Sequence, residues 1–142
     1  MSDINNKLNL TIENCLKDFI SLEGINIPLE IRDEEADGNV ILEFSDSSMF
    51  LLYGVTESSF LVIDDDLQLY ENDKSRFVNI SSNKFWSTRI GVEITNIEEL
   101  MDGDTRFGIR FYLKNNSHFE ICYYWDTEYD SETTVIRPYP SN

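Results

Sequence analysis

The stretch that decides the fold spans residues 107–126 and reads FGIRFYLKNNSHFEICYYWD. Two runs of alternating apolar and mixed side chains flank a polar segment, Asn115-Asn116-Ser117. Alternate residues of a strand point to opposite faces of a sheet, so this pattern predicts two amphipathic strands joined by a tight turn. The apolar face carries Phe107, Ile109, Phe111, Leu113, Phe119, Ile121, Tyr123 and Trp125.

The length of the connecting loop decides which residues of this hairpin lie opposite each other. A two-residue loop would pair Leu113 with His118 and divide the apolar residues between both faces. A three-residue loop keeps them on one face, and we therefore expect it. The resulting pairs are Leu113 with Phe119, Phe111 with Ile121 and Ile109 with Tyr123. Asparagine tolerates the left-handed conformation that such a loop needs.

The composition predicts a single cytoplasmic domain, residues 1–142. A chain of 142 residues can bury a sizeable core. The sequence has no apolar run long enough for a bilayer, and its first residues lack the features of a secretory signal. With only two cysteines, Cys15 and Cys122, we expect reduced thiols rather than a disulfide framework.

The chain is strongly acidic, and its charge is unevenly distributed. Its 27 Asp and Glu outnumber 11 Lys and Arg, giving a net charge of −16. Residues 1–71 hold 16 acids and 3 bases, whereas residues 72–142 hold 11 acids and 8 bases. This balance argues against binding to nucleic acid or to an anionic membrane, both of which need a basic footprint. It favours either plain solubility or a basic protein partner reached by electrostatic steering.

Residues 4–22 predict a helix. Apolar side chains recur there at three- and four-residue spacing, at Leu8, Ile12, Cys15, Leu16, Phe19 and Ile20. Gly24 suits the end of a helix, and Pro28 prevents its continuation. We expect this helix to cover one face of a sheet rather than to bind a partner, because a lone sheet needs a cover.

Two β-meanders are expected after the helix. The first, about residues 40–70, has a tight turn at Asp46-Ser47-Ser48 and a second turn over residues 54–59. Residues 77–80 form either a short strand or a turn of helix. The second meander, about residues 86–137, contains a strand over 86–94. Residues 97–101 could form a helical turn capped by Asn96 or continue the strand, and we prefer the strand because an Asp-Gly turn, Asp102-Gly103-Asp104, follows it. The decisive hairpin and a short strand at 134–136 complete it.

These elements together predict an α+β fold, in which an N-terminal helix packs on a largely antiparallel, meander-type β-sheet of six or more strands.

The residues from Trp86 onward resemble those of small acidic bacterial immunity proteins, which are encoded beside toxins of contact-dependent inhibition and other polymorphic toxin systems. The resemblance covers about the last 55 residues and consists mostly of apolar spacing. It is carried by Trp86, Ile90-Gly91, Ile94, Ile97, Gly108-Ile109-x-Phe111, Phe119-x-Ile121 and residues 123–126. It implies a cytosolic antitoxin that binds the C-terminal domain of a cognate toxin, often a nuclease with a basic cleft, and blocks its active site.

The sequence contains few groups typical of catalysis. His118 is the only histidine, which excludes sites that need two, and it is expected at the surface of a bend. The chain has neither a nucleophile-elbow pattern nor a glycine-rich phosphate loop. The pairs Glu98–Glu99 and Asp126–Glu128 could mimic the acid pair of a glycosidase but are equally typical of solvated charge runs. We therefore expect no enzymatic activity, no bound metal and no cofactor.

Acidic residues that lie beside aromatic ones are the candidates for a toxin interface, because Tyr anchors interfaces and carboxylates pair with basic partners. The favoured set is Tyr124, Asp126, Glu128, Tyr129, Asp130 and Glu132. Two further groups are Asp64, Asp65, Asp66 and Tyr70, and Asp33, Glu34, Glu35 and Asp37. The alternative function is a small cytosolic ligand-binding domain or an enzyme whose pocket the sequence does not reveal. The oligomeric state is not predicted.

Overall fold

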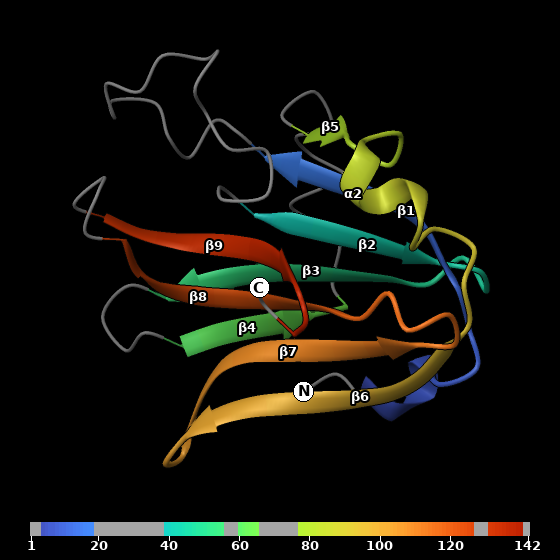
Figure 1. Ribbon diagram of the computed structural model, residues 1–142. Helices are drawn as coiled ribbons and strands as arrows, with labels where there is room; N and C mark the ends of the chain where they lie inside the picture. The colour runs from blue at the N-terminus through green and yellow to red at the C-terminus, as the bar shows by residue number, and fades with distance from the viewer. Residues whose placement is uncertain (1–3, 19–38, 56–59, 66–76, 127–130, 141–142) are drawn as a thin grey trace.

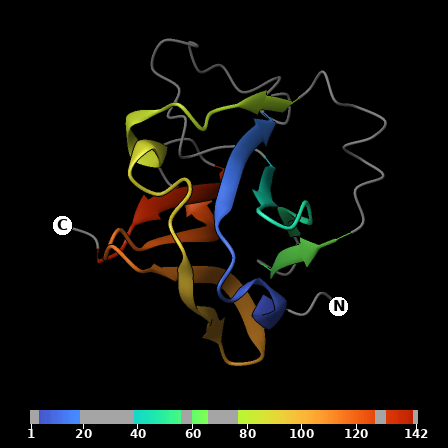
Figure 2. The ribbon, with the colours of Figure 1, turned by 90° about the vertical axis from the view of Figure 1, so that its right-hand side faces the viewer.

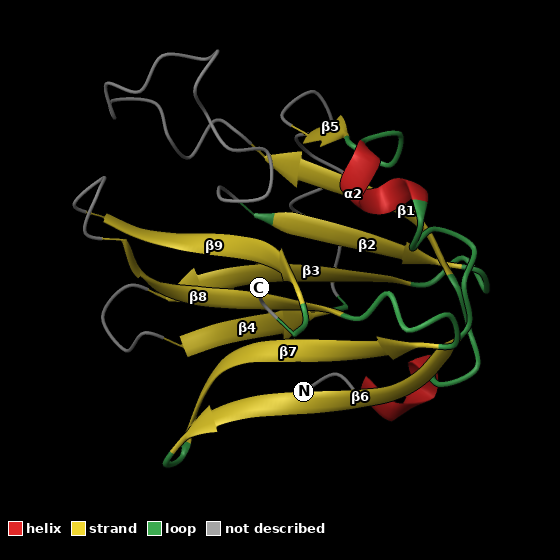
Figure 3. Ribbon diagram, viewed as in Figure 1, coloured by secondary structure: helices red, strands yellow, loops and turns green. Residues whose placement is uncertain are grey.

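The computed structural model describes residues 4–18, 39–55, 60–65, 77–126 and 131–140. Within these ranges nearly all regular structure is antiparallel β-sheet, and helix is confined to two single turns (Figure 3). The elements are η1 (Ile4–Lys7), β1 (Ile12–Asp18), β2 (Val40–Phe44), β3 (Met49–Val55), β4 (Phe60–Asp64), β5 (Phe77–Asn79), α2 (Lys84–Ser87), β6 (Ile94–Asp102), β7 (Thr105–Leu113), β8 (Phe119–Asp126) and β9 (Ser131–Pro138).

The strands form two sheets that pack face to face. A five-stranded sheet has the order β4-β3-β2-β1-β5, and a four-stranded sheet has the order β6-β7-β8-β9 (Figure 1). Turned by a quarter, the molecule shows the two sheets as separate layers (Figure 2). One hydrophobic core lies between them, with Leu42, Phe50 and Leu52 from the first sheet against Ile109, Phe111 and Ile121 from the second. The predicted antiparallel pairing is therefore confirmed, but the strands divide into sheets of five and four and do not form the expected single sheet of six or more.

The predicted N-terminal helix is wrong. Only Ile4–Lys7 forms a 3₁₀ turn, and residues 12–18 form strand β1 between β2 and β5. A β-bulge between Ile12 and Asn14 explains the misleading pattern. The extra residue lets Ile12 and Cys15 both face the core although they are three positions apart, which imitates helical spacing. The second sheet supplies the cover expected from the helix; residues 19–22 of the prediction lie outside the described ranges.

The hairpin of residues 107–126 is confirmed in its strands and, from Ile109 to Tyr123, in its apolar face, but not in its register. Phe107, also expected on that face, is only half-buried, and the Trp125 side chain lies outside what the structure describes. Phe111 pairs with Phe119 and Ile109 with Ile121, so the loop spans five residues, 114–118. His118 closes this longer loop, because its Nδ1 accepts the Leu113 N–H at 2.9 Å. Asn116 takes the expected left-handed conformation, with φ of 65°.

The expected strand over residues 86–94 is also wrong. Residues 84–87 form α2, which buries the Trp86 ring, and β6 begins only at Ile94. The strand expected over 97–101, the Asp-Gly hairpin after it and the tight turn at residues 46–48 are confirmed. Gly54, expected in a turn, instead lies in β3, and residues 67–70 lie outside the described ranges. Among the residues that are described, no helix combines the length and apolar character that crossing a membrane requires.

Gly54 marks a close approach between the sheets. A Cβ added there would overlap the Tyr123 ring, which is buried in the core. We expect Gly54→Ala to lower the free energy of unfolding by about 1–3 kcal/mol, because the ring or a strand must shift. Urea unfolding measures this. Gly103→Asn is the control, since φ there is +60°, nothing lies within 4 Å and asparagine accepts that conformation. Equal midpoints for both variants would contradict the close packing.

Candidate functional site

The outer face of the four-stranded sheet carries a row of alternating charge, here called the ion row. It consists of Glu98 on β6, Arg110 on β7, Glu120 on β8 and Arg137 on β9, each directly opposite the next. Antiparallel pairing brings these four residues together from distant parts of the sequence. Opposite charges at directly paired positions stabilise a sheet.

Glu120 is the centre of the ion row and is almost completely buried, with 3% of its surface exposed. Arg110 donates from Nε and Nη2 to Oε2 at 3.0 and 2.9 Å. Arg137 donates from Nε to Oε1 at 2.8 Å. Both carboxylate oxygens of Glu120 are therefore held by guanidinium groups, which is how a buried charge is tolerated.

Glu98 lies at the exposed end of the ion row. Its Oε1 accepts the Tyr112 hydroxyl at 2.8 Å and Nη1 of Arg110 at 2.8 Å. These hydrogen bonds, that from Tyr112 first, hold the pKa of Glu98 below its usual range. Glu98 therefore stays anionic at neutral pH. Glu99 points to the other face of the sheet, where it pairs with Arg106 at 3.0 Å. Adjacent residues on opposite faces cannot form the acid pair of a glycosidase.

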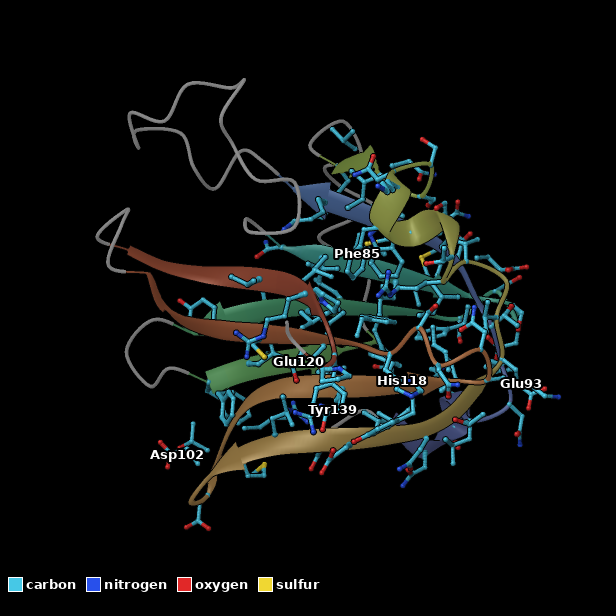
Figure 4. The ribbon with its side chains drawn as sticks, in the orientation of Figure 1. Phe85, Glu93, Asp102, His118, Glu120 and Tyr139 are labelled. Carbon is cyan, nitrogen blue, oxygen red and sulfur yellow. The ribbon has the colours of Figure 1, made fainter. Side chains whose placement is uncertain are left out.

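Aromatic rings lie next to the ion row. The guanidinium of Arg110 lies 3.6 Å from the centre of the Tyr139 ring. The Tyr112 ring lies 5.0 Å from that of His118 and 6.0 Å from that of Tyr139. Figure 4 shows Glu120, Tyr139 and His118 following one another across this face. The result is an ordered polar and aromatic surface.

The cysteines are not poised to act as nucleophiles. Both are buried and form no disulfide. Burial raises the pKa of Cys122 to about 11, although Nη2 of Arg137 approaches its sulfur at 3.7 Å. Burial also raises the pKa of Cys15. Both thiols are thus protonated at neutral pH, and the thiolate is the reactive form. In the described part of the chain, no group of three or more His, Cys, Asp or Glu is placed to hold a metal ion.

The predicted interface residues that the structure describes fall at two opposite ends of the sandwich. Asp126 ends β8 and pairs with Ser131 at the start of β9, at the left of Figure 1. Asp64 ends β4 at the other end, and the exposed Asp65 follows it. Tyr124 lies in β8 and Glu132 in β9. The structure therefore separates Asp64 and Asp65 from the group around Asp126. The remaining candidates lie outside the described residues: Asp33, Glu34, Glu35, Asp37, Asp66, Tyr70, Glu128, Tyr129 and Asp130.

The end that contains Asp126, here called the Asp126 end, collects several other strand termini. β1 and β3 end there, and β2 and β4 begin there (Figure 1). The β6–β7 turn at the same end exposes Asp102 and Asp104. The chain thus leaves the sandwich at this end before the acidic stretches 19–38 and 127–130 and re-enters it there after them.

The sequence pattern predicted neither the ion row nor the burial of Arg106. Arg106 is buried, and its Nε donates to the Leu61 carbonyl of the other sheet at 3.1 Å. A β-bulge between Gly108 and Arg106 turns this side chain toward the core and leaves Phe107 half-buried. The ion row was visible in part, since Arg110 and Glu120 share the polar face of the hairpin.

No family model, curated protein or solved structure matches the chain.

Proposed function

We propose that this protein is an immunity-type inhibitor that binds a basic toxin domain and covers its active site. The observation that carries the proposal is the net charge of −16, much of it in stretches that join the sandwich at the Asp126 end. A partner with a basic substrate cleft, such as a nuclease, would be attracted to this end. The resemblance of residues 86–126 to immunity proteins supports the same conclusion.

The Asp126 end is the proposed contact surface for the toxin. It exposes Asp102 and Asp104 in the β6–β7 turn, and the backbones of Tyr124, Asp126 and Glu132 lie in the strands beside it. Exposed charges steer a partner during diffusion and determine the rate of encounter more than the final affinity. Aromatic anchors supply most of the affinity in such interfaces. Tyr124 and Tyr129 are the anchors that the sequence favours.

Two charge-neutralised variants test this proposal. One combines Asp126→Asn, Glu128→Gln and Asp130→Asn, and the other combines Asp64→Asn, Asp65→Asn and Asp66→Asn. Both remove three negative charges, but Asp126 and Asp64 lie at opposite ends of the sandwich. At low salt we expect the first to slow association with the toxin domain on the order of tenfold and the second to slow it much less. Raising the salt should reduce the difference.

The partner for this experiment is the toxin domain encoded beside this protein, identified by pull-down and measured by stopped-flow. Tyr129→Ala should mainly speed dissociation. Circular dichroism checks that the variants fold, and survival of cells expressing the toxin reports protection. If both triple variants slowed association equally, the overall charge of the protein would determine the association rate, and the proposed surface would be wrong. If no neighbouring toxin domain binds the parent protein, the immunity function fails and the ligand-binding alternative replaces it.

A further inference from the structure

His118 joins three parts of the fold at one end of the four-stranded sheet. Its Nδ1 accepts the N–H of Leu113, the last residue of β7, at 2.9 Å. Its carbonyl oxygen accepts the N–H of Tyr139 at 3.0 Å and Nη2 of Arg89 at 3.4 Å. The imidazole therefore connects the 114–118 loop to β7, while the backbone of the same residue connects it to the segment after β9 and to the turn after α2.

The hydrogen bond to Leu113 fixes the protonation state of the ring. A neutral imidazole has one acceptor nitrogen, whereas an imidazolium has two N–H donors and no acceptor. Because Nδ1 accepts a hydrogen bond, the proton of the neutral ring lies on Nε2. If the ring took up a second proton, the Leu113 N–H would lose its hydrogen-bond acceptor. Because Leu113 is buried, water does not readily replace that acceptor.

Two basic residues, Arg89 and Lys114, belong to the segments that meet at His118. Arg89 contacts its carbonyl, lies 3.9 Å from the centre of the Phe85 ring and makes no ion pair with any described carboxylate. Lys114 is in the same loop as His118, and its backbone N–H donates to the backbone carbonyl of Glu93 at 3.0 Å.

The His118 ring packs beside aromatic rings that adjoin the ion row. Tyr112 packs against the imidazole as a neutral ring, and Tyr139 packs against Tyr112. Glu98 accepts hydrogen bonds from the Tyr112 hydroxyl and from Arg110. Among the residues that the structure describes, no carboxylate forms a hydrogen bond or ion pair with the His118 side chain.

We propose that His118 is a proton-sensitive latch: when its ring takes up a proton, the bond from the Leu113 N–H breaks and the His118 side chain releases the end of β7. Histidine is the residue type whose charge ordinarily changes between about pH 5 and 8, so a test of the latch spans this range. The loop retains its own bonds, such as Asn116 N–H to the Leu113 carbonyl at 3.0 Å. The opening is therefore local, and the sandwich stays folded.

Amide hydrogen exchange, expressed as protection factors that correct for the intrinsic pH dependence, tests the latch. In the parent protein we expect the protection of the Leu113 amide to fall about fivefold between about pH 8 and pH 5, the equivalent of one ordinary hydrogen bond. The Ile121 amide, in β8 opposite Ile109, should keep its protection and serves as the internal control.

Two variants separate the latch from general acid sensitivity. His118→Asn places a non-titrating acceptor near the position of Nδ1, so protection of Leu113 should no longer depend on pH. His118→Ala removes the acceptor, so protection should be low at both pH values. Unchanged protection of Leu113 in the parent protein overturns the proposal. The same fall in His118→Asn also overturns it, because another group must then be responsible. If His118→Ala does not fold, the comparison of the parent with His118→Asn decides.

Discussion

Phe111→Ala is expected to lower the free energy of unfolding by about 3–5 kcal/mol, because it leaves a cavity in a core that cannot fully collapse. The Phe111 ring is fully buried between the sheets and stacks on Phe119 at 5.0 Å, and the Phe119 ring meets Trp86 edge-on. For a domain of this size the loss should lower the melting temperature by about 10 °C or more. Differential scanning calorimetry measures it.

Tyr112→Ala is the matched control, because Tyr112 is the next residue along β7 and faces outward. It would lose the hydrogen bond to Glu98 and ring contacts with His118 and Tyr139, all at the surface. We expect a loss of about 1 kcal/mol. Similar melting temperatures for the two variants would contradict the assignment of the two faces.

The faces of the hairpin were predictable because strand periodicity depends on nothing outside the strand. Phe111, Ile109 and Ile121 point to the core as the alternation requires. Register is different, because a shift by two residues preserves every face. Pairing the apolar residues of the two strands with one another favoured the shorter loop, which would place Arg110 opposite Cys122. The observed register places Arg110 opposite Glu120, and this charge pair was the sequence signal for the longer loop.

The N-terminal strand was not predictable from periodicity, because a β-bulge changes the period locally. With the bulge between Ile12 and Asn14, Cys15 faces the core with Ile12, while Leu16 joins a second cluster on the outer face. Apolar residues on both faces of β1 match the spacing of a helix better than that of a half-buried strand. Pairing with β2 and β5 outweighs this local pattern.

The ion row required the whole sheet before it could be recognised. Glu98 and Arg137 lie on the two edge strands and meet the inner pair only through the order β6-β7-β8-β9. The acidic interface candidates were visible in the sequence, but their places in the fold were not. Only the antiparallel connections of the strands assign Asp126 and Asp64 to opposite ends of the sandwich.

Glu120→Ala is expected to lower the free energy of unfolding by about 2–3 kcal/mol, because it leaves two guanidinium groups without the carboxylate that holds them. The side chain of Arg110 is 17% exposed and that of Arg137 is 39% exposed, so water compensates Arg137 better than Arg110. The expected loss of unfolding free energy is therefore smaller than for removing one partner of a fully buried ion pair. Urea unfolding at neutral pH measures it, and Glu98→Gln, at the 47% exposed end of the ion row, should cost much less.

A double-mutant cycle shows whether the loss comes from the ion pair. Arg110→Met keeps an apolar stem over the Tyr139 ring and removes the charge that faces Glu120. In this background Glu120→Ala should cost clearly less than in the parent, because its principal partner is already absent. Equal losses in both backgrounds would mean that Arg110 does not stabilise the buried carboxylate. Arg137 or packing against the neighbouring strands would then be the source of its effect.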